Sequence, residues 1–104
     1  MPMFFFQFEV RPEHTHPLRD QYAGATVNCW ILRDTQSQAE AVAQAWIGDE
    51  DWRITRVEEA RLMTRENQAE HPEGMEYFEQ AEIDGEVLVF DTWPVEAPDD
   101  NDVG

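Results

Sequence analysis

The sequence predicts one small α+β domain with the element order β-β-α-β-α-β and a generally ferredoxin-like character. Four segments carry the apolar patterns of β-strands, and two carry the spacing of amphipathic helices. The 104 residues, 41% of them hydrophobic, suffice for one core but not for two. We therefore expect residues 1–94 to form a four-stranded mixed or antiparallel sheet with both helices packed on one face, and residues 95–104 to form a disordered acidic tail.

The first two strands are predicted by alternation. Between residues 3 and 11, apolar side chains recur at every second position, which indicates one buried face: Phe4, Phe6, Phe8 and Val10. A second strand repeats the pattern after the loop 12–24, with a buried face made of Ala25, Val27, Cys29 and Ile31. Two large aromatic residues, Phe5 and Trp30, fall on the other face of their strands, away from the predicted buried face.

A helix is expected to begin near residue 35. Both Thr35 with Gln38 and Ser37 with Glu40 have the spacing of a capping box. The stripe that should face the core recurs every three to four residues: Ala39, Val42, Ala43, Trp46 and Ile47. Gly48 is placed to end this helix in the left-handed conformation.

A third strand starts at Trp52, but its alternation slips at Val57, which a bulge, a break or two short strands would explain. Residues 65–71 read as a polar connection. Pro72 suits the first turn of a second helix, whose buried side carries Met75, Phe78 and Ala81 and whose end is marked by Asp84 and Gly85.

The last strand, residues 86–90, is apolar on both faces, which is typical of a central position in a sheet. Together with Phe5 and Trp30 it would load the face that the two helices leave open. Because monomers rarely expose such a patch, we expect a homodimer that covers it. The residues expected at this interface, or lining a pocket, are Phe5, Trp30, Asp91 and Trp93.

The chain is strongly acidic, because 23 Asp and Glu face only 7 basic residues and give a formal net charge of -16. Proteins that hold nucleic acid neutralise its phosphates with Lys and Arg, so direct nucleic-acid binding is disfavoured. An anionic membrane surface is disfavoured for the same reason, and no apolar run reaches the ~18 residues of a membrane span. We expect any protein partner to be basic.

Cys29 is the only cysteine, so no disulfide can form within the chain and nothing indicates an oxidising compartment. Its place among apolar neighbours indicates a buried, inert thiol rather than a nucleophile. The first residues lack the basic region of a secretory signal and meet an acid at Glu9. We therefore expect a cytoplasmic protein.

Few side chains suggest chemistry. His14 and His16, with His71 elsewhere, admit a metal-site interpretation, but solvated surface histidines explain them better. Asp91 follows an apolar run, where burial would raise its pKa, although a hydrogen-bonded structural role is the stronger interpretation. Phosphate-binding loops, nucleophile elbows and Cys-x-x-Cys pairs do not occur. The sequence assigns no catalytic residue, no metal ligand and no cofactor, and it favours a non-enzymatic protein.

Residues 76–94, which contain Glu86-Val87-Leu88-Val89-Phe90, together with Val27-Asn28-Cys29-Trp30-Ile31, resemble a group of short uncharacterised bacterial proteins of unknown function. The resemblance covers mainly the last quarter of the chain and one strand. It implies a bacterial domain without an assigned activity, and it transfers no catalytic residue.

Four functional hypotheses follow. The leading one is an acidic interaction domain of the inhibitor, immunity or adaptor type that binds a basic protein. A narrower version is a nucleic-acid mimic whose carboxylates imitate phosphates. The alternative is a small-molecule-binding or enzymatic dimer with an aromatic-lined pocket, which a cavity near Trp30 or Trp93 containing Asp91 or a histidine would favour. The fourth is that the acidity serves solubility or a salty cytoplasm.

Overall fold

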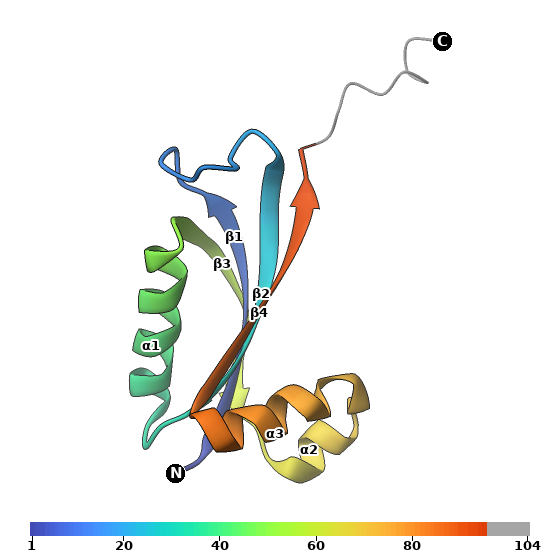
Figure 1. Ribbon diagram of the computed structural model, residues 1–104. Helices are drawn as coiled ribbons and strands as arrows, with labels where there is room; N and C mark the ends of the chain where they lie inside the picture. Colours follow the sequence, from blue (N-terminus) through green and yellow to red (C-terminus); the bar gives the residue numbers. More distant parts are fainter. Residues whose placement is uncertain (96–104) are drawn as a thin grey trace, which may run out of the picture.

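The computed structural model describes residues 1–95, which form a four-stranded antiparallel sheet with helices on both faces (Figure 1). The strands are β1 (Met3–Pro12), β2 (Tyr22–Leu32), β3 (Trp52–Leu62) and β4 (Glu86–Pro94). The helices are α1 (Gln36–Asp49), α2 (Arg65–Ala69), the short 3-10 helix η1 (Pro72–Gly74) and α3 (Met75–Asp84). The α+β class and the four-stranded sheet are confirmed. The predicted acidic tail lies outside the described residues, apart from Val95.

The strands lie in the order β3-β1-β2-β4, and every neighbouring pair is antiparallel. The first two form a hairpin in which Phe5 lies opposite Trp30. β3 and β4 occupy the two edges, so the prediction that the last strand is central is wrong for the chain by itself. The element order also differs from the β-α-β-β-α-β order of ferredoxin-like folds, so that likeness is not confirmed.

One face of the sheet, here called the α1 face, is covered by α1. The alternating residues predicted for β1 and β2 lie on it, and Phe6, Phe8, Val27, Cys29 and Ile31 are fully buried. From α1 they meet Ala39, Ala43 and Ile47. The capping box uses Thr35 and Gln38, the first of the two predicted pairs. The main core is therefore the one that the period-two pattern predicted.

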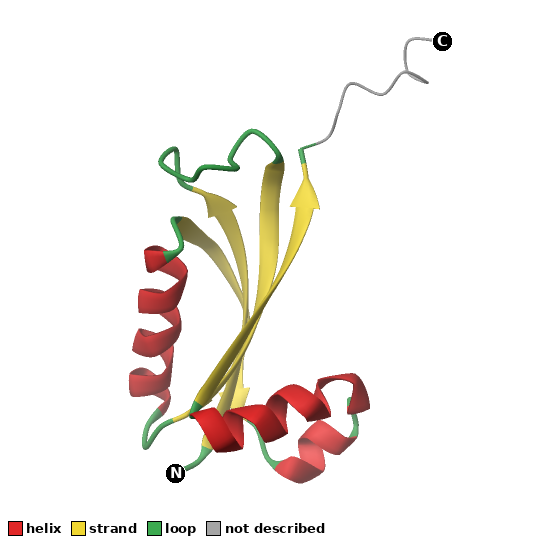
Figure 2. Ribbon diagram, viewed as in Figure 1, coloured by secondary structure: helices red, strands yellow, loops and turns green. Residues whose placement is uncertain are grey.

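The opposite face, the α3 face, holds a second core, so the expectation that the chain suffices for one core but not for two is wrong. Phe5 and Trp30 are 8% and 5% exposed, and they pack with Phe78 and Ala81 of α3. Both helices on one face is thus a wrong prediction. The physical reason is topological: β3 and β4 are at opposite edges, so the chain between them must cross the sheet, and α1 already covers the other face (Figure 2).

The slip in the third strand is confirmed as a bulge. β3 is continuous from Trp52 to Leu62, and its register against β1 shifts twice, between Gln7 and Phe8 and between Glu9 and Val10. These shifts let β3 remain paired where its alternation fails.

The predicted ends of the helices are partly right. Gly85 ends α3 as predicted, and its φ of 92° places it in the left-handed conformation that glycine favours at this position. Gly48 does not end α1, which continues to Asp49, and the positive φ falls on Asp51 instead. The connection 65–71 contains the unpredicted helix α2, which Thr64 caps by accepting a hydrogen bond from the backbone N–H of Asn67.

Candidate functional site

A hollow of about 420 Å³ opens on the α3 face, and we call it the α3-face hollow. Phe5, Trp30 and Val89 line it from the sheet. Polar side chains from the strands and from the segment α2 to α3 complete the lining: Gln7, Asn28, Glu59, Arg61, Gln68, His71, Glu73, Tyr77 and Asp91. Its volume is within the range of small-molecule sites.

The base of the hollow is held by Trp30. Its ring lies 5.1 Å from that of Phe5 and 5.2 Å from that of Tyr77, between centroids. Its indole N–H donates to Oε1 of Gln68 at 2.8 Å, and Nε2 of Gln68 donates to the backbone carbonyl of His71, also at 2.8 Å. Because Gln68 bonds to both Trp30 and the backbone at His71, it ties the base of the hollow to the adjoining wall.

The rim carries more acidic than basic groups. Glu59 comes from β3, Glu73 from η1 and Asp91 from β4, whereas Arg61 is the only arginine in the lining. Nε of Arg61 is buried, has no hydrogen-bond partner within residues 1–95, and lies 3.5 Å from a carboxylate oxygen of Glu59. Such a rim favours a ligand that is neutral or cationic and that also offers a hydrogen-bond acceptor.

The structure brings three of the four predicted site residues together. Phe5, Trp30 and Asp91 line the same hollow, with His71 at its rim. Asp91 is exposed rather than buried. Trp93 lies outside the lining, near the C-terminal end of β4. There the guanidinium carbon of Arg11 is 5.5 Å from the ring centroid of Trp93. The exposed apolar face from which the homodimer was expected does not exist at Phe5 and Trp30, because α3 covers them.

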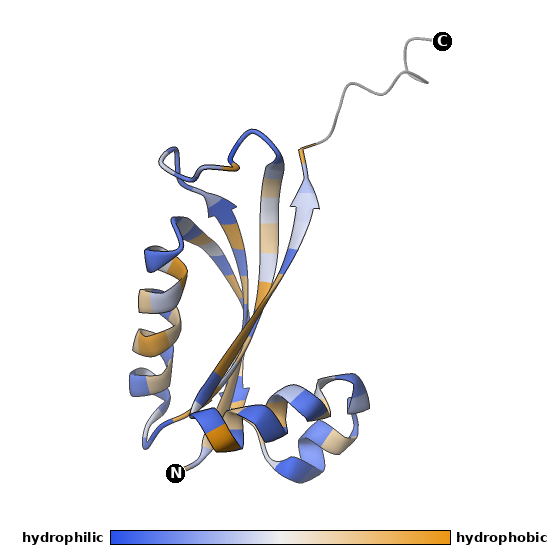
Figure 3. Ribbon diagram, viewed as in Figure 1, coloured by the Kyte–Doolittle hydropathy of each residue, from blue (hydrophilic) through white to orange (hydrophobic). Residues whose placement is uncertain are grey.

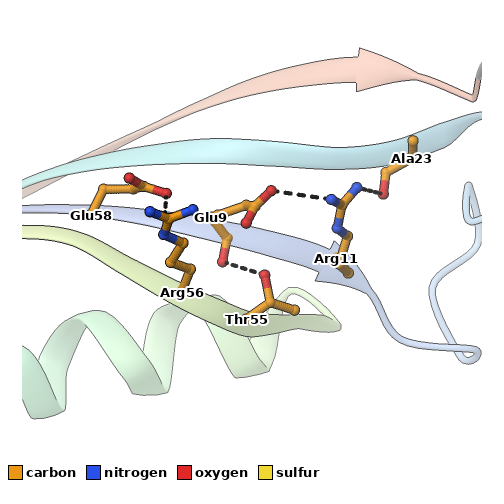
Figure 4. Close-up of polar contacts among 6 residues, drawn as sticks. All are labelled: Glu9, Arg11, Ala23, Thr55, Arg56 and Glu58. Atoms are coloured by element: carbon orange, nitrogen blue, oxygen red, sulfur yellow. Dashed lines mark hydrogen bonds and ion pairs between the residues drawn. The ribbon is translucent and has the colours of Figure 1, made fainter.

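Beyond the hollow, the part of the α3 face that no helix covers carries charged and hydrogen-bonded side chains together with the half-buried Trp93. Arg11 bridges a carboxylate oxygen of Glu9 at 3.1 Å and the backbone carbonyl of Ala23 at 2.9 Å (Figure 4). On β3 the hydroxyl of Thr55 donates to the backbone carbonyl of Glu9, and Arg56 pairs with Glu58 (Figure 4). These charged and hydrogen-bonded groups suit a surface that is exposed to water.

A second hollow of about 450 Å³ lies on the α1 face, and we call it the β4 groove. It is largely aromatic and apolar, with a lining that includes Leu18, Tyr22, Trp46, Trp52, Leu88 and Phe90. Trp46, predicted in the core stripe, is 45% exposed, and its indole N–H donates to Glu86, which also pairs with Arg33 at 2.6 Å. Sequence reasoning missed this groove, because Trp46 fits a core stripe equally well.

His16 and His71 lie at different hollows, and Cys29 is buried, as its apolar neighbours predicted. His16 packs against Trp52 with 4.6 Å between ring centroids and lines the β4 groove, whereas His71 lines the α3-face hollow. Within residues 1–95 no three His, Cys, Asp or Glu side chains come together as a metal site. Burial raises the pKa of the Cys29 thiol to about 12, so at neutral pH it is protonated and unsuited to nucleophilic attack.

Comparisons with protein-family models, curated proteins and solved structures gave no match to this chain. The resemblance to short bacterial proteins therefore remains an expectation. Within residues 1–95, none of the helices combines the length and the apolar composition that crossing a bilayer requires.

Proposed function

We propose that this chain is a non-enzymatic, cytoplasmic interaction domain that binds a basic protein through its acidic exterior. The observation that carries the proposal is the pairing of its charges. Every arginine lies within 4.0 Å of a carboxylate oxygen of its own chain. The basic side chains are thus already neutralised, and the excess of carboxylates is left to face solvent.

The excess is concentrated around the helices. Within residues 1–95, the carboxylates without an arginine partner fall at the two ends of α1, around α2 to α3, and at one site on β4: Asp34, Glu40, Asp49, Glu50, Asp51, Glu66, Glu70, Glu73, Glu76, Asp84 and Asp91. Such fields accelerate association with a cationic partner and lose their effect as salt is added.

The test compares two neutralised variants with the wild-type chain. Glu66→Gln combined with Glu70→Gln and Glu73→Gln removes charge around α2 and η1, and Glu40→Gln combined with Asp49→Asn and Glu50→Gln removes it along α1. Each is used with the wild-type chain to capture proteins from lysate at about 0.05 M and 0.5 M NaCl. A candidate is then purified and titrated by calorimetry.

We expect a basic protein whose affinity falls with salt and is weakened by one variant but not by the other. Equal effects of both variants would indicate nonspecific attraction, and no partner at either salt concentration would count against the proposal. Competition by duplex DNA for the same partner would identify the chain as a nucleic-acid mimic.

A second candidate function is small-molecule binding in the α3-face hollow. The observation that favours it is that Trp30, His71 and Asp91 line one hollow of suitable volume. A hollow with aromatic side chains at its base and carboxylates around it suits an alkylamine that carries an aromatic ring. The ring meets apolar side chains, and the ammonium meets Glu59, Glu73 or Asp91.

Tryptamine and indole-3-acetate are a matched pair of probes, since they share a ring and differ in the sign of their charge. In NMR titrations up to about 1 mM, tryptamine should shift the amide signals of Trp30, Gln68 and Asp91. The substitution Asp91→Asn should weaken tryptamine binding. Equal shifts with indole-3-acetate, or no shifts at these residues, would contradict this function.

A further inference from the structure

β4 is an edge strand whose sequence suits an inner strand. On one side Val87 and Val89 pack with the core of the α3 face, and on the other Leu88 and Phe90 pack with the core of the α1 face. Figure 3 shows the lower part of β4 as a continuous hydrophobic stretch. Strands that are apolar on both faces normally have a neighbour on each side. Within residues 1–95, β4 has only β2 as a neighbouring strand.

The other edge is protected against pairing in the ways that natural sheets use. β3 is bulged twice, and charged side chains run along it: Arg53, Arg56, Glu58, Glu59 and Arg61. β4 has neither device between residues 86 and 91, because its only register shift against β2 lies near Tyr22 and Gly24, and its charges, Glu86 and Asp91, flank the apolar run. The β4 edge can therefore pair with another strand more readily than the β3 edge.

The hydrogen bonds between β2 and β4 show which backbone groups of β4 point away from β2. At one end the N–H of Leu32 donates to the carbonyl of Gly85 at 2.9 Å, and at the other the N–H of Val95 donates to the carbonyl of Gln21 at 2.8 Å. Odd-numbered residues therefore bond to β2. Because bonded and non-bonded pairs alternate in antiparallel ladders, the outward groups belong to the even-numbered residues, which also line the β4 groove: Glu86, Leu88, Phe90 and Thr92.

We propose that the β4 edge pairs antiparallel with the β4 edge of a second copy of this chain, joining the two sheets into one of eight strands. A two-fold axis at Val89 places Leu88 opposite Phe90, Val87 opposite Asp91 and Glu86 opposite Thr92. Outward-facing residues then meet outward-facing residues, as the hydrogen bonds require.

The occupant is a second copy because the strand is complementary to itself. In this register no carboxylate faces a carboxylate, and the β4 grooves of the two copies meet on the same side of the joined sheet. The run 87–90 contains no charged residue, and Glu86 beside it is already paired with Arg33. This part of the edge therefore has no free charge that would select a basic strand instead. The pairing gives β4 the central position that its sequence is typical of.

Salt separates this inference from the proposed function. Two copies with a net charge of -16 each repel one another, so added salt should strengthen self-association. Binding to a basic protein should weaken under the same conditions. Either proposal can therefore fail while the other holds.

The test is sedimentation equilibrium of the full chain from about 1 to 200 µM, at about 0.05 M and 0.5 M NaCl. We expect a mass that rises toward twice 12.2 kDa, at lower concentration in the higher salt. A monomer at every concentration and both salt concentrations would overturn the proposal.

Hydrogen exchange locates the interface. The amides of Leu88 and Phe90 should gain protection as concentration rises, because a second strand gives them backbone acceptors that no strand within residues 1–95 provides. A dimer in which these amides stay unprotected uses another surface, and that result would also overturn the proposal.

Two lysine substitutions on opposite edges form a matched pair. Leu88→Lys on β4 should lower the dimer association constant at least tenfold, whereas Val57→Lys on β3, at a side chain 52% exposed, should leave it unchanged or raise it. Both substitutions reduce the net negative charge equally, so only a local effect can separate them. Equal association constants for the two variants would contradict the assigned edge.

Should Leu88→Lys fail to fold, Thr92→Pro replaces it. Thr92 is exposed, and the proline removes an outward N–H without removing a bond to β2. Circular dichroism at low concentration checks that the variant is folded. A folded Thr92→Pro variant should also dimerise more weakly. An association constant equal to that of the wild-type chain would contradict the pairing of Glu86 with Thr92.

Discussion

The indole nitrogen of Trp30 and the side-chain oxygen of Gln68 form a buried hydrogen bond of 2.8 Å that ties β2 to α2. Gln68 is 2% exposed and is the only buried polar side chain within residues 1–95. It reaches into the second core because Trp30 carries the one polar atom there that needs an acceptor. The bond therefore fixes the α2 region against the sheet, and with it one wall of the α3-face hollow.

Replacing Gln68 with leucine should lower the free energy of unfolding by about 1–3 kcal/mol, because the indole N–H loses its acceptor in a buried site. Gln44→Leu, at an exposed position of α1, should have little effect. Chemical denaturation of Gln68→Leu, Trp30→Phe and the double variant measures the coupling. Strictly additive losses would show that the bond contributes nothing beyond packing.

Two glycines should respond oppositely to alanine. A Cβ on Gly74 would lie 2.7 Å from Nε2 of Gln68 and 3.0 Å from Cζ2 of Trp30, so Gly74→Ala should cost about 1–3 kcal/mol. A Cβ on Gly48 meets no atom of residues 1–95 within 4 Å, and Gly48→Ala should stabilise α1 by about 0.5–1 kcal/mol. Thermal unfolding of both variants checks this, and a destabilised Gly48→Ala would contradict the helical placement of Gly48.

Burial of Cys29 should make stability fall at alkaline pH. Its pKa is raised from 9.0 to about 12 in the folded state, so above about pH 9 the unfolded chain loses the thiol proton while the folded chain keeps it. The free energy of unfolding should then decrease by about 1.4 kcal/mol per pH unit, and no such contribution should remain below pH 9.

The measurement is denaturation of the wild-type chain and of Cys29→Ala between about pH 7 and pH 11. The variant loses packing at every pH, but its stability should decline less steeply above pH 9. Parallel curves would show that another group causes the alkaline loss. The native thiol should also resist alkylation until the chain unfolds.

The cap of α1 can be tested by its two sequence candidates. The side chain of Thr35 accepts from the backbone N–H of Gln38 at 3.2 Å, and the side chain of Gln38 accepts from the backbone N–H of Thr35, also at 3.2 Å. Thr35→Ala should cost about 1 kcal/mol, whereas Ser37→Ala should cost little, because Ser37 lies inside the helix. Urea midpoints measure both, and an equal loss would contradict the assignment of the cap.

The candidate site was only partly visible in the sequence. Phe5 and Trp30 stood out because large aromatic residues interrupt a polar alternation, and Asp91 because it ends an apolar run. These residues line one hollow together with His71 because η1, which is distant from them in the sequence, packs near this face of the sheet. The part played by Gln68 had no sequence signal, since a glutamine in a polar connection reads as exposed.

By itself, the sequence determined what depends on local periodicity. Alternation placed Phe6 and Cys29 on a buried face, the three-to-four spacing gave α1 and α3, and the charge of the chain needed no coordinates. Only the tertiary structure decided which face each helix covers and which strands lie at the edges. Those features follow from how long connections cross the sheet, and periodicity along a strand reports that two faces exist without reporting what is packed on them.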